Sequence, residues 1–204
     1  MFDQLKALDA SLLLFFNHLD NPVLDFLMYW ASNKWIWIPF YICLAYFVYK
    51  KYPHRFISIL LFVAFMTALS DQLASTVIKN SVMRLRPCHD PSIASEVHLV
   101  YGYCGGKYGF VSSHASNAFA LAAFLIFLFR KEYLNLQWII LGWAILVSFS
   151  RIYLAAHFPG DVIGGALLGT LLGIAAQRTF KLYDKNFNPV KRKSRKHSRS
   201  ANKI

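Results

Sequence analysis

Five long apolar segments constrain the fold of this chain more than any other feature. They cover residues 35–49, 56–69 (continuing less purely to Ile78), 118–129, 138–149 and 162–176. A spanning helix needs about 20 residues, range about 17–25, so several segments reach that length only with their flanking Ser, Thr, Asn and Gly residues. The chain is 56% hydrophobic and 16% charged, against about 45–50% and about 25% in soluble domains.

These segments predict an all-α fold, a polytopic transmembrane bundle of about five to six helices. The alternative is a soluble all-helical protein with buried helices. It is disfavoured because five such segments in 204 residues leave too little polar surface to cover them.

The N-terminal segment predicts an amphipathic helix that lies at the membrane interface or packs on the bundle. Its apolar residues recur at helical spacing: Leu5, Leu8, Leu12, Phe15, Phe16 and Leu19. It does not resemble a signal peptide, because one Lys faces two Asp before the apolar run and no small-residue cleavage site follows. Asn21-Pro22 breaks this helix, and residues 23–31 begin another whose crossing of the membrane is left open.

Basic clusters predict the orientation. Lys and Arg gather at residues 50–55, at residues 130–133 and in the tail from Lys191. The positive-inside rule places all three in the cytoplasm. Residues 79–110 and 151–160 then face the extracytoplasmic side.

The tail also suggests a division of the chain into a membrane domain, residues 1–185, and a basic cytoplasmic tail, residues 186–204. Much of the formal charge of +12 lies in this tail. We expect it to contact anionic headgroups of the bilayer rather than nucleic acid, because no interleaved aromatic residues or nucleic-acid fold accompany it.

Three polar clusters lie where apolar segments end on the predicted outer face. They read KNSVMRLRP (residues 79–87), VSSHASN (residues 111–117) and SRIYLAAHFPGD (residues 150–161). Cations on this side are exceptions to the positive-inside rule, and ionisable groups near membrane depth are usually functional.

The clusters carry groups that suit a phosphate. Lys79, Arg86 and Arg151 supply fixed cations, and arginine matches phosphate oxygens bidentately. Ser112 and Ser113 stand where the next helix begins, so their hydroxyls and free N–H groups form an anion site.

Two histidines complete a phosphoryl-transfer set. His157 and Asp161 are spaced i, i+4, so the carboxylate can hold one ring nitrogen and make the other a better nucleophile. With His114, one histidine can attack phosphorus while the other protonates the leaving oxygen.

Taken together, the clusters resemble the signature of the type 2 phosphatidic acid phosphatase (PAP2) superfamily, K-x6-R-P, P-S-G-H and S-R-x5-H-x3-D. Lys79 with Arg86-Pro87 fits the first element, and Ser150-Arg151, His157 and Asp161 fit the third. The second element departs from the pattern, because Val111 replaces Pro and Ser113 replaces Gly.

The resemblance implies roles for these residues. His157 is the nucleophile that forms a phosphohistidine, Asp161 is its partner and His114 is the general acid. The phosphate-binding residues are Lys79, Arg86, Ser112, Ser113 and Arg151. No metal or other cofactor is implied. The resemblance also implies a bacterial inner-membrane protein whose substrate is a lipid phosphate at the periplasmic face. Lipid A is preferred, with undecaprenyl diphosphate next and phosphatidylglycerol phosphate or phosphatidate as further alternatives.

Two other classes compete with this interpretation. A metal hydrolase would use His89, Asp90, His98, His114, His157 and Asp161. No H-E-x-x-H motif or comparable spacing of metal ligands appears in the sequence. A transporter or a lipid-binding protein without activity is the second, and it is disfavoured because every proposed catalytic side chain is present.

The loop from Cys88 to Phe110 is expected to cover the site. Cys88 and Cys104 share the outer loop, so we predict a disulfide between them; free thiols are the alternative if the loop faces the cytosol. Headgroup contacts are expected from Arg84, His89, Asp90 and Lys107. Arg84 is left between an inner supporting contact and an interface anchor.

Overall fold

A computed structural model describes residues 2–129 and 132–187, and its regular elements are helices, as predicted. The α-helices are α1 Phe2–Asn17, α2 Pro22–Ser32, α3 Ile38–Lys51, α4 Phe56–Gln72, α5 Lys79–Val82, α6 Ser113–Phe129, α7 Leu134–Tyr153 and α8 Pro159–Phe187. A π-helical segment, Leu73–Ile78, joins α4 to α5.

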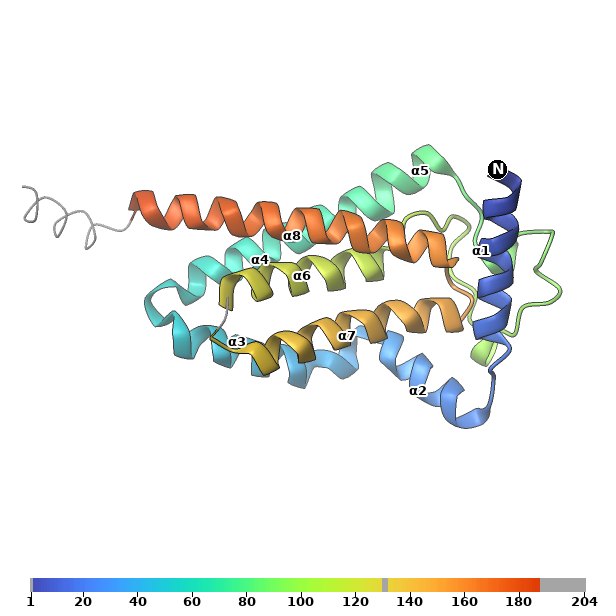
Figure 1. Cartoon of the computed structure of the whole chain (residues 1–204), viewed down its shortest axis with the longest axis horizontal. Coiled ribbons are helices and arrows are strands. Elements are labelled where there is room, and N and C mark those ends of the chain that lie inside the picture. Colours follow the sequence, from blue (N-terminus) through green and yellow to red (C-terminus); the bar gives the residue numbers. More distant parts are fainter. Residues whose placement is uncertain (1, 130–131, 188–204) are drawn as a thin grey trace, which may run out of the picture.

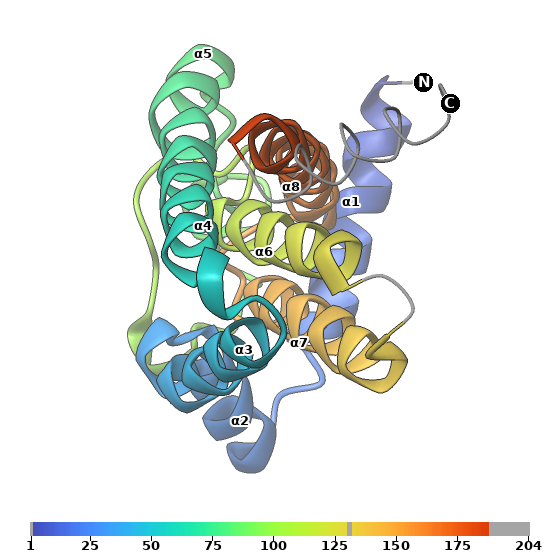
Figure 2. The ribbon, with the colours of Figure 1, turned by 90° about the vertical axis from the view of Figure 1, so that its left-hand side faces the viewer.

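The long helices lie side by side around α6 (Figures 1 and 2). Helices α3, α4, α6, α7 and α8 follow the long axis. Each of the last four contains one of the predicted apolar segments, and α3 contains residues 38–49 of the first. Helix α1 crosses one end of the bundle almost perpendicular to this axis (Figure 1).

Three stretches of the described chain are long and apolar enough to cross a membrane: Pro53–Val82, Leu134–Tyr153 and Pro159–Lys185. The apolar helix α6 is shorter, at 17 residues, which is the lower limit for a crossing of about 17–25 residues. With three helices of that length and composition, the protein is a multi-pass membrane protein.

Helix α2 has 11 residues, about 16 Å of helix, so it cannot cross the membrane alone.

Helix α1 exposes much of its apolar surface at the end of the bundle. Leu5 is 58% and Phe15 is 62% exposed, whereas Leu13 is fully buried against the bundle. This arrangement suits a helix that lies along the membrane interface while it packs on the helices beneath.

Small residues bring α8 against α6. A Cβ atom added to Gly165 or Gly169 would meet the carbonyl oxygen of Ser112 or Ser116, and one on Gly173 would meet that of Ala120. Glycines four residues apart let two membrane helices approach backbone to backbone. This contact fixes the register between the start of α6 and the start of α8.

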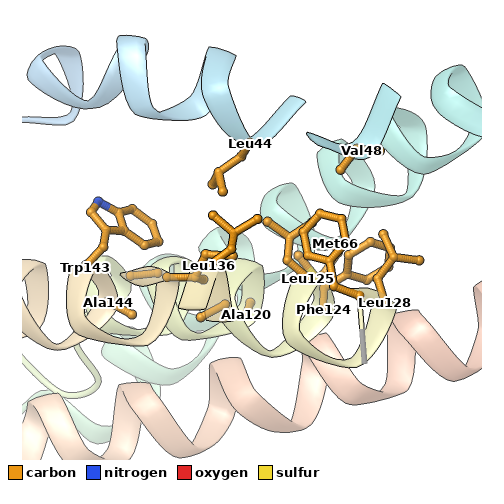
Figure 3. Close-up of a cluster of buried hydrophobic side chains, with 14 of the residues drawn as sticks. Leu44, Val48, Met66, Ala120, Phe124, Leu125, Leu128, Leu136, Trp143 and Ala144 are labelled. Carbon is orange, nitrogen blue, oxygen red and sulfur yellow. The ribbon is translucent and has the colours of Figure 1, made fainter. Parts of the chain in front are cut away.

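A hydrophobic cluster fills the centre of the bundle (Figure 3). Leu44 and Val48 from α3 face Phe124 and Leu128 from α6, and Trp143 enters from α7. The buried members of this cluster carry no charged side chain, so the charged groups that chemistry needs must lie elsewhere.

Ion pairs gather the basic loops at one end of the bundle. Lys51 binds Glu132 at 2.7 Å, and Arg55 binds Asp184 near the end of α8 at 2.5 Å. The segments that contain residues 79–110 and 151–160 lie at the opposite end, next to α1 (Figure 1). Helix α8 continues through Phe187, and residues 188–204 of the predicted tail lie outside the described residues.

Candidate active site

The first polar cluster is turned inward by an irregular helix. The π-helical segment Leu73–Ile78 comes directly before Lys79, whose residue is only 9% exposed. Because a π-helical turn is wider than an α-helical turn, it changes which face of the helix the following residues occupy. Such segments are frequent at functional sites. Met83 then adopts a left-handed conformation, with φ of 51°, and ends the helix.

The outer loop holds Arg86 in place. Its backbone N–H donates to the Lys107 carbonyl at 3.0 Å, and its Nε donates to the Tyr108 carbonyl at 3.1 Å. A Cβ atom on Gly105 would collide with the Arg86 guanidinium, so this side chain requires a glycine where it crosses the loop.

The second cluster forms the start of α6. Ser112 is fully buried, and its N–H donates to the Asp161 carbonyl at 3.0 Å. Ser113 is the first residue of the helix and His114 the second. Because Ser113 has an ordinary helical backbone, it presents its N–H as a glycine would, and the helix N-terminus adds a partial positive charge.

The third cluster pairs His157 with Asp161. Their side chains are 1% and 0% exposed, and His157 Nδ1 lies 3.6 Å from Asp161 Oδ2. Helix α8 begins at Pro159, so the carboxylate lies in its first turn, where Oδ2 also accepts from the Phe158 N–H at 3.1 Å. Because the carboxylate is on the Nδ1 side, Nε2 is the nitrogen left for chemistry.

The charges around His157 keep its ring neutral. Burial, followed by the charges of Arg151, Arg86 and Lys79, holds the pKa of His157 well below its ordinary value. The structure therefore brings the predicted cations of the first and third clusters, Lys79, Arg86 and Arg151, close enough to act on one imidazole. A neutral imidazole among cations can attack a phosphorus atom whose oxygens those cations hold.

Arg151 is buried, at 3% exposure, and two residues that were not predicted position it. Its guanidinium donates to the Ser32 hydroxyl and, at 3.2 Å, to the Tyr103 hydroxyl. Burial acts to raise the pKa of Tyr103, but Arg151 and Arg86 outweigh it and hold that pKa below its ordinary value. Arg151 Nε is buried and has no hydrogen-bond partner among the residues that the structure describes.

The structure joins Cys88 to Cys104 by a disulfide that spans 16 residues. Tyr103 is the neighbour of Cys104 and contacts Arg151. The disulfide therefore ties the segment that contacts Arg151 to the rest of the loop.

Arg84 points toward the site rather than toward lipid headgroups. It donates to Asp161 Oδ1 at 2.8 Å and to Asp9 Oδ2 at 2.6 Å, and its guanidinium lies 4.2 Å from the centre of the Phe158 ring. Asp9 also accepts from the Gly160 N–H at 2.7 Å. Helix α1 is thus connected, through Arg84, to the carboxylate beside His157.

The other predicted headgroup contacts lie in the outer loop. His89 is exposed and contacts the Gly105 carbonyl at 3.1 Å. Asp90 accepts from Ser92, and Lys107 lies 5.7 Å from the centre of the Tyr108 ring. Among the described residues, the side chains close enough to share a metal are Cys88, His89 and Cys104, but a disulfide occupies both sulfurs.

Two cavities meet beside His114. A smaller one of about 160 Å³ reaches Tyr103 and Arg151, and a larger one of about 580 Å³ runs between α3, α4, α6 and α7. Ser32 and His114 line both cavities. The larger cavity is mostly apolar but also contains Asp71 and Asn117.

Sequence reasoning missed Asp9, Ser32, Asp71, Tyr103 and Asn117. Asp71 carried a signal, because it is a charge inside an apolar segment. Asn117 follows His114 by three residues on the same helix, which places it on nearly the same face. The others reach the site only through tertiary packing.

The chain is similar in sequence to known proteins over the region that contains the three polar clusters. Residues 59–183 match the sequence model of the PAP2 superfamily. The lipid A 4′-phosphatase of Bacteroides thetaiotaomicron is 39% identical over 171 residues, which cover 83% of this chain and 75% of that protein. The lipid A 4′-phosphatase of Porphyromonas gingivalis is 36% identical over 84% of this chain and 72% of that protein.

Two crystal structures share the fold. LpxE of Aquifex aeolicus superimposes with a TM-score of 0.59 and 24% identity, over 82% of this chain and 93% of that one. A PAP2-type phosphatidylglycerolphosphate phosphatase of Bacillus subtilis gives a TM-score of 0.62 and 21% identity, over 91% and 88%. At these identities the structures establish the transmembrane fold alone.

Proposed function

The chain belongs to the PAP2 superfamily of membrane lipid phosphatases, and from that premise we propose that it removes the 4′-phosphate of lipid A. The observation that carries the chemistry is a buried His157 whose Nδ1 lies 3.6 Å from the buried carboxylate of Asp161, while the charges of Arg151, Arg86 and Lys79 lower its pKa. Two relatives named as lipid A 4′-phosphatases support the substrate.

In the proposed mechanism, His157 Nε2 attacks phosphorus. The new N–P bond forms as the bond from phosphorus to the sugar oxygen breaks, and protonated His114 gives its proton to that oxygen. Asp161 keeps Nδ1 protonated and balances the positive charge that develops on the ring.

The phosphate oxygens are held by groups already in place. Lys79, Arg86 and Arg151 offset the negative charge, and the N–H groups at the start of α6 donate to the same oxygens. Water then attacks the phosphohistidine while His114 accepts its proton, which releases inorganic phosphate and restores His157. Fixed cations fulfil the electrostatic role in this scheme, so we expect full activity in EDTA.

We place the active site at the periplasmic face of the inner membrane. The basic residues 50–55 and the end of α8 lie at the opposite end of the bundle, which the positive-inside rule assigns to the cytoplasm. A lipid phosphate in the outer leaflet would then reach His157 from the side of the bundle. Cysteine labelling of loops in intact cells tests this orientation.

A panel of lipids in detergent tests the substrate. Purified protein is incubated in EDTA with lipid A, undecaprenyl diphosphate, phosphatidylglycerol phosphate and phosphatidate, and phosphate release is measured beside the His157→Gln variant. We expect the highest kcat/KM on lipid A and no release by the variant. Turnover of the isoprenoid with lipid A untouched would overturn the proposed substrate.

A further inference from the structure

A carboxylate stands beside the active site without a place in the proposed mechanism. Asp71 lies on α4 within the membrane-spanning stretch Pro53–Val82, eight residues before Lys79. That separation is about 12 Å along a helix. A charged side chain at such a depth is energetically costly and usually marks a functional group.

One hydrogen bond orients Asp71. Asn117 Nδ2 donates to Asp71 Oδ1 at 3.1 Å. The opposite amide orientation would place two acceptors against each other, so this contact also determines which way Asn117 points. Among the described residues, Asp71 receives no other hydrogen bond and has no cation within ion-pair distance.

The atoms left over at this pair are acceptors. Asp71 Oδ2 has no partner in the described chain, and Asn117 Oδ1 is buried without one. A ligand that satisfied the pair would have to bring N–H or O–H donors, since neither oxygen can donate. Trp143 also lines this cavity, and its buried Nε1 donor has no acceptor among the described residues.

The pair lies where the leaving group of the reaction belongs. Asp71 and Asn117 line the 580 Å³ cavity that also contains His114. Asn117 follows His114 by three residues on α6, about 4.5 Å deeper along the helix. Since His114 protonates the leaving oxygen in the proposed mechanism, the next helical turn faces the molecule to which that oxygen is attached.

We propose that Asp71 and Asn117 form a specificity site that selects a phosphorylated glycolipid by accepting hydrogen bonds from its sugar hydroxyl or amide groups. This inference rests on the proposed function. A polyprenyl diphosphate has no donors once it is ionised, so it cannot donate a hydrogen bond to the half-buried Asp71 carboxylate or to the buried Asn117 Oδ1. Sites that hydrogen-bond a substrate discriminate strongly against analogues that lack the bonding group.

The test compares two lipids in one detergent. We measure kcat/KM for lipid A and for undecaprenyl diphosphate with the wild-type protein and with Asp71→Asn. Hydrogen bonds to charged groups are stronger than neutral ones, so kcat/KM for lipid A should fall about tenfold to a hundredfold. The isoprenoid value should change by less than about threefold.

Two further variants keep the test decisive. Asn117→Ala removes the group that orients the carboxylate and should reduce the same lipid A preference. Gln72→Leu changes an exposed polar residue of the same helix that does not line the cavity, and it should leave both values unchanged.

Each outcome bears on a separate claim. A preference that falls in Asp71→Asn through lipid A alone supports the specificity site. Equal losses on both lipids, or no loss on either, overturn it while the phosphatase remains. If the wild-type protein releases phosphate from neither lipid, the proposed function fails, and the specificity site fails with it.

Discussion

The end of the site where we propose that the phosphate binds, here called the phosphate end, contains Arg151, His157 and Asp161. These residues are at most 3% exposed and are held by segments from across the chain. In the cavity, by contrast, Asp71 has one hydrogen-bond partner within the described part of the chain, and its Oδ2 accepts from none of those residues. The phosphate end thus resembles a preorganised site for a group common to all candidate substrates. The cavity presents hydrogen-bond acceptors that have no donor among the described residues, next to the part in which the candidate substrates differ. We therefore assign the chemistry to the first region and substrate selection to the second.

The largest effect should come from a change that disrupts both regions. Ser112 lies directly before helix α6, Asn117 lies on that helix, and Gly169 sets the contact of α6 with α8. Gly169→Leu would force a side chain into the Ser116 carbonyl, so we expect a loss of about 3 kcal/mol or more of stability. Phosphate release from both lipids should disappear.

Gly142→Leu is the matched control for that change, because a side chain there meets open space. Thermal unfolding in detergent, followed by circular dichroism, should show the difference. Equal unfolding temperatures for the two variants would mean that the α6–α8 contact does not depend on glycine.

A change confined to the phosphate end should lower activity without altering selection. Arg84→Gln removes the ion pairs to Asp161 and Asp9, and we expect kcat to fall about tenfold to a hundredfold on both lipids. Arg84→Lys should restore part of it. Arg55→Gln breaks a similar pair at the opposite end of the bundle and should change little; an equal loss there would mean a general effect on folding.

The disulfide should matter less. Cys88→Ser frees the loop that carries Tyr103 to Arg151, with a loss of stability of about 3 kcal/mol at most on the chain-entropy model. We expect kcat/KM to fall about threefold to tenfold on both lipids. Cys43→Ser, at the exposed free cysteine, is the control. A change in lipid preference in Cys88→Ser would mean that the loop takes part in substrate selection instead.

The smallest effect is a shift in a titration curve. Because burial and Arg151 lower the pKa of His157, its ring should still be neutral in the free protein as the pH falls through the ordinary value of about 6.5. NMR of protein labelled with ¹⁵N in its histidine rings measures this, with His157→Gln to assign the signal. Protonation at or above pH about 6.5 would contradict the charge environment described for this residue.

The two regions also differ in how far the sequence predicts them. The apolar segments predicted the helical membrane bundle, and the family resemblance is confirmed by the match over residues 59–183. The residues named at the phosphate end have fixed spacings, so His157 and Asp161 are recognisable without a structure. Asp71 has no spacing relation to them, because packing of α4 on α6 brings it to the cavity.

Tertiary packing also explains why the supporting residues were missed. Asp9 reaches the site only because α1 crosses the end of the bundle, and Tyr103 only because its loop folds back onto Arg151. Arg84 was left between two interpretations because its neighbours along the chain do not reveal its carboxylate partners. Local pattern predicts an element, but it does not predict which distant element packs against it.

The covalent intermediate that we propose at His157 is the central step of the mechanism. Purified protein is mixed with lipid A, quenched in alkali within its first turnovers and digested, and the peptides are analysed by mass spectrometry. We expect phosphate on the peptide that contains His157, stable in alkali and lost in acid, and none in His157→Gln. Phosphate release by His157→Gln at the wild-type rate, without a labelled histidine, would contradict the mechanism.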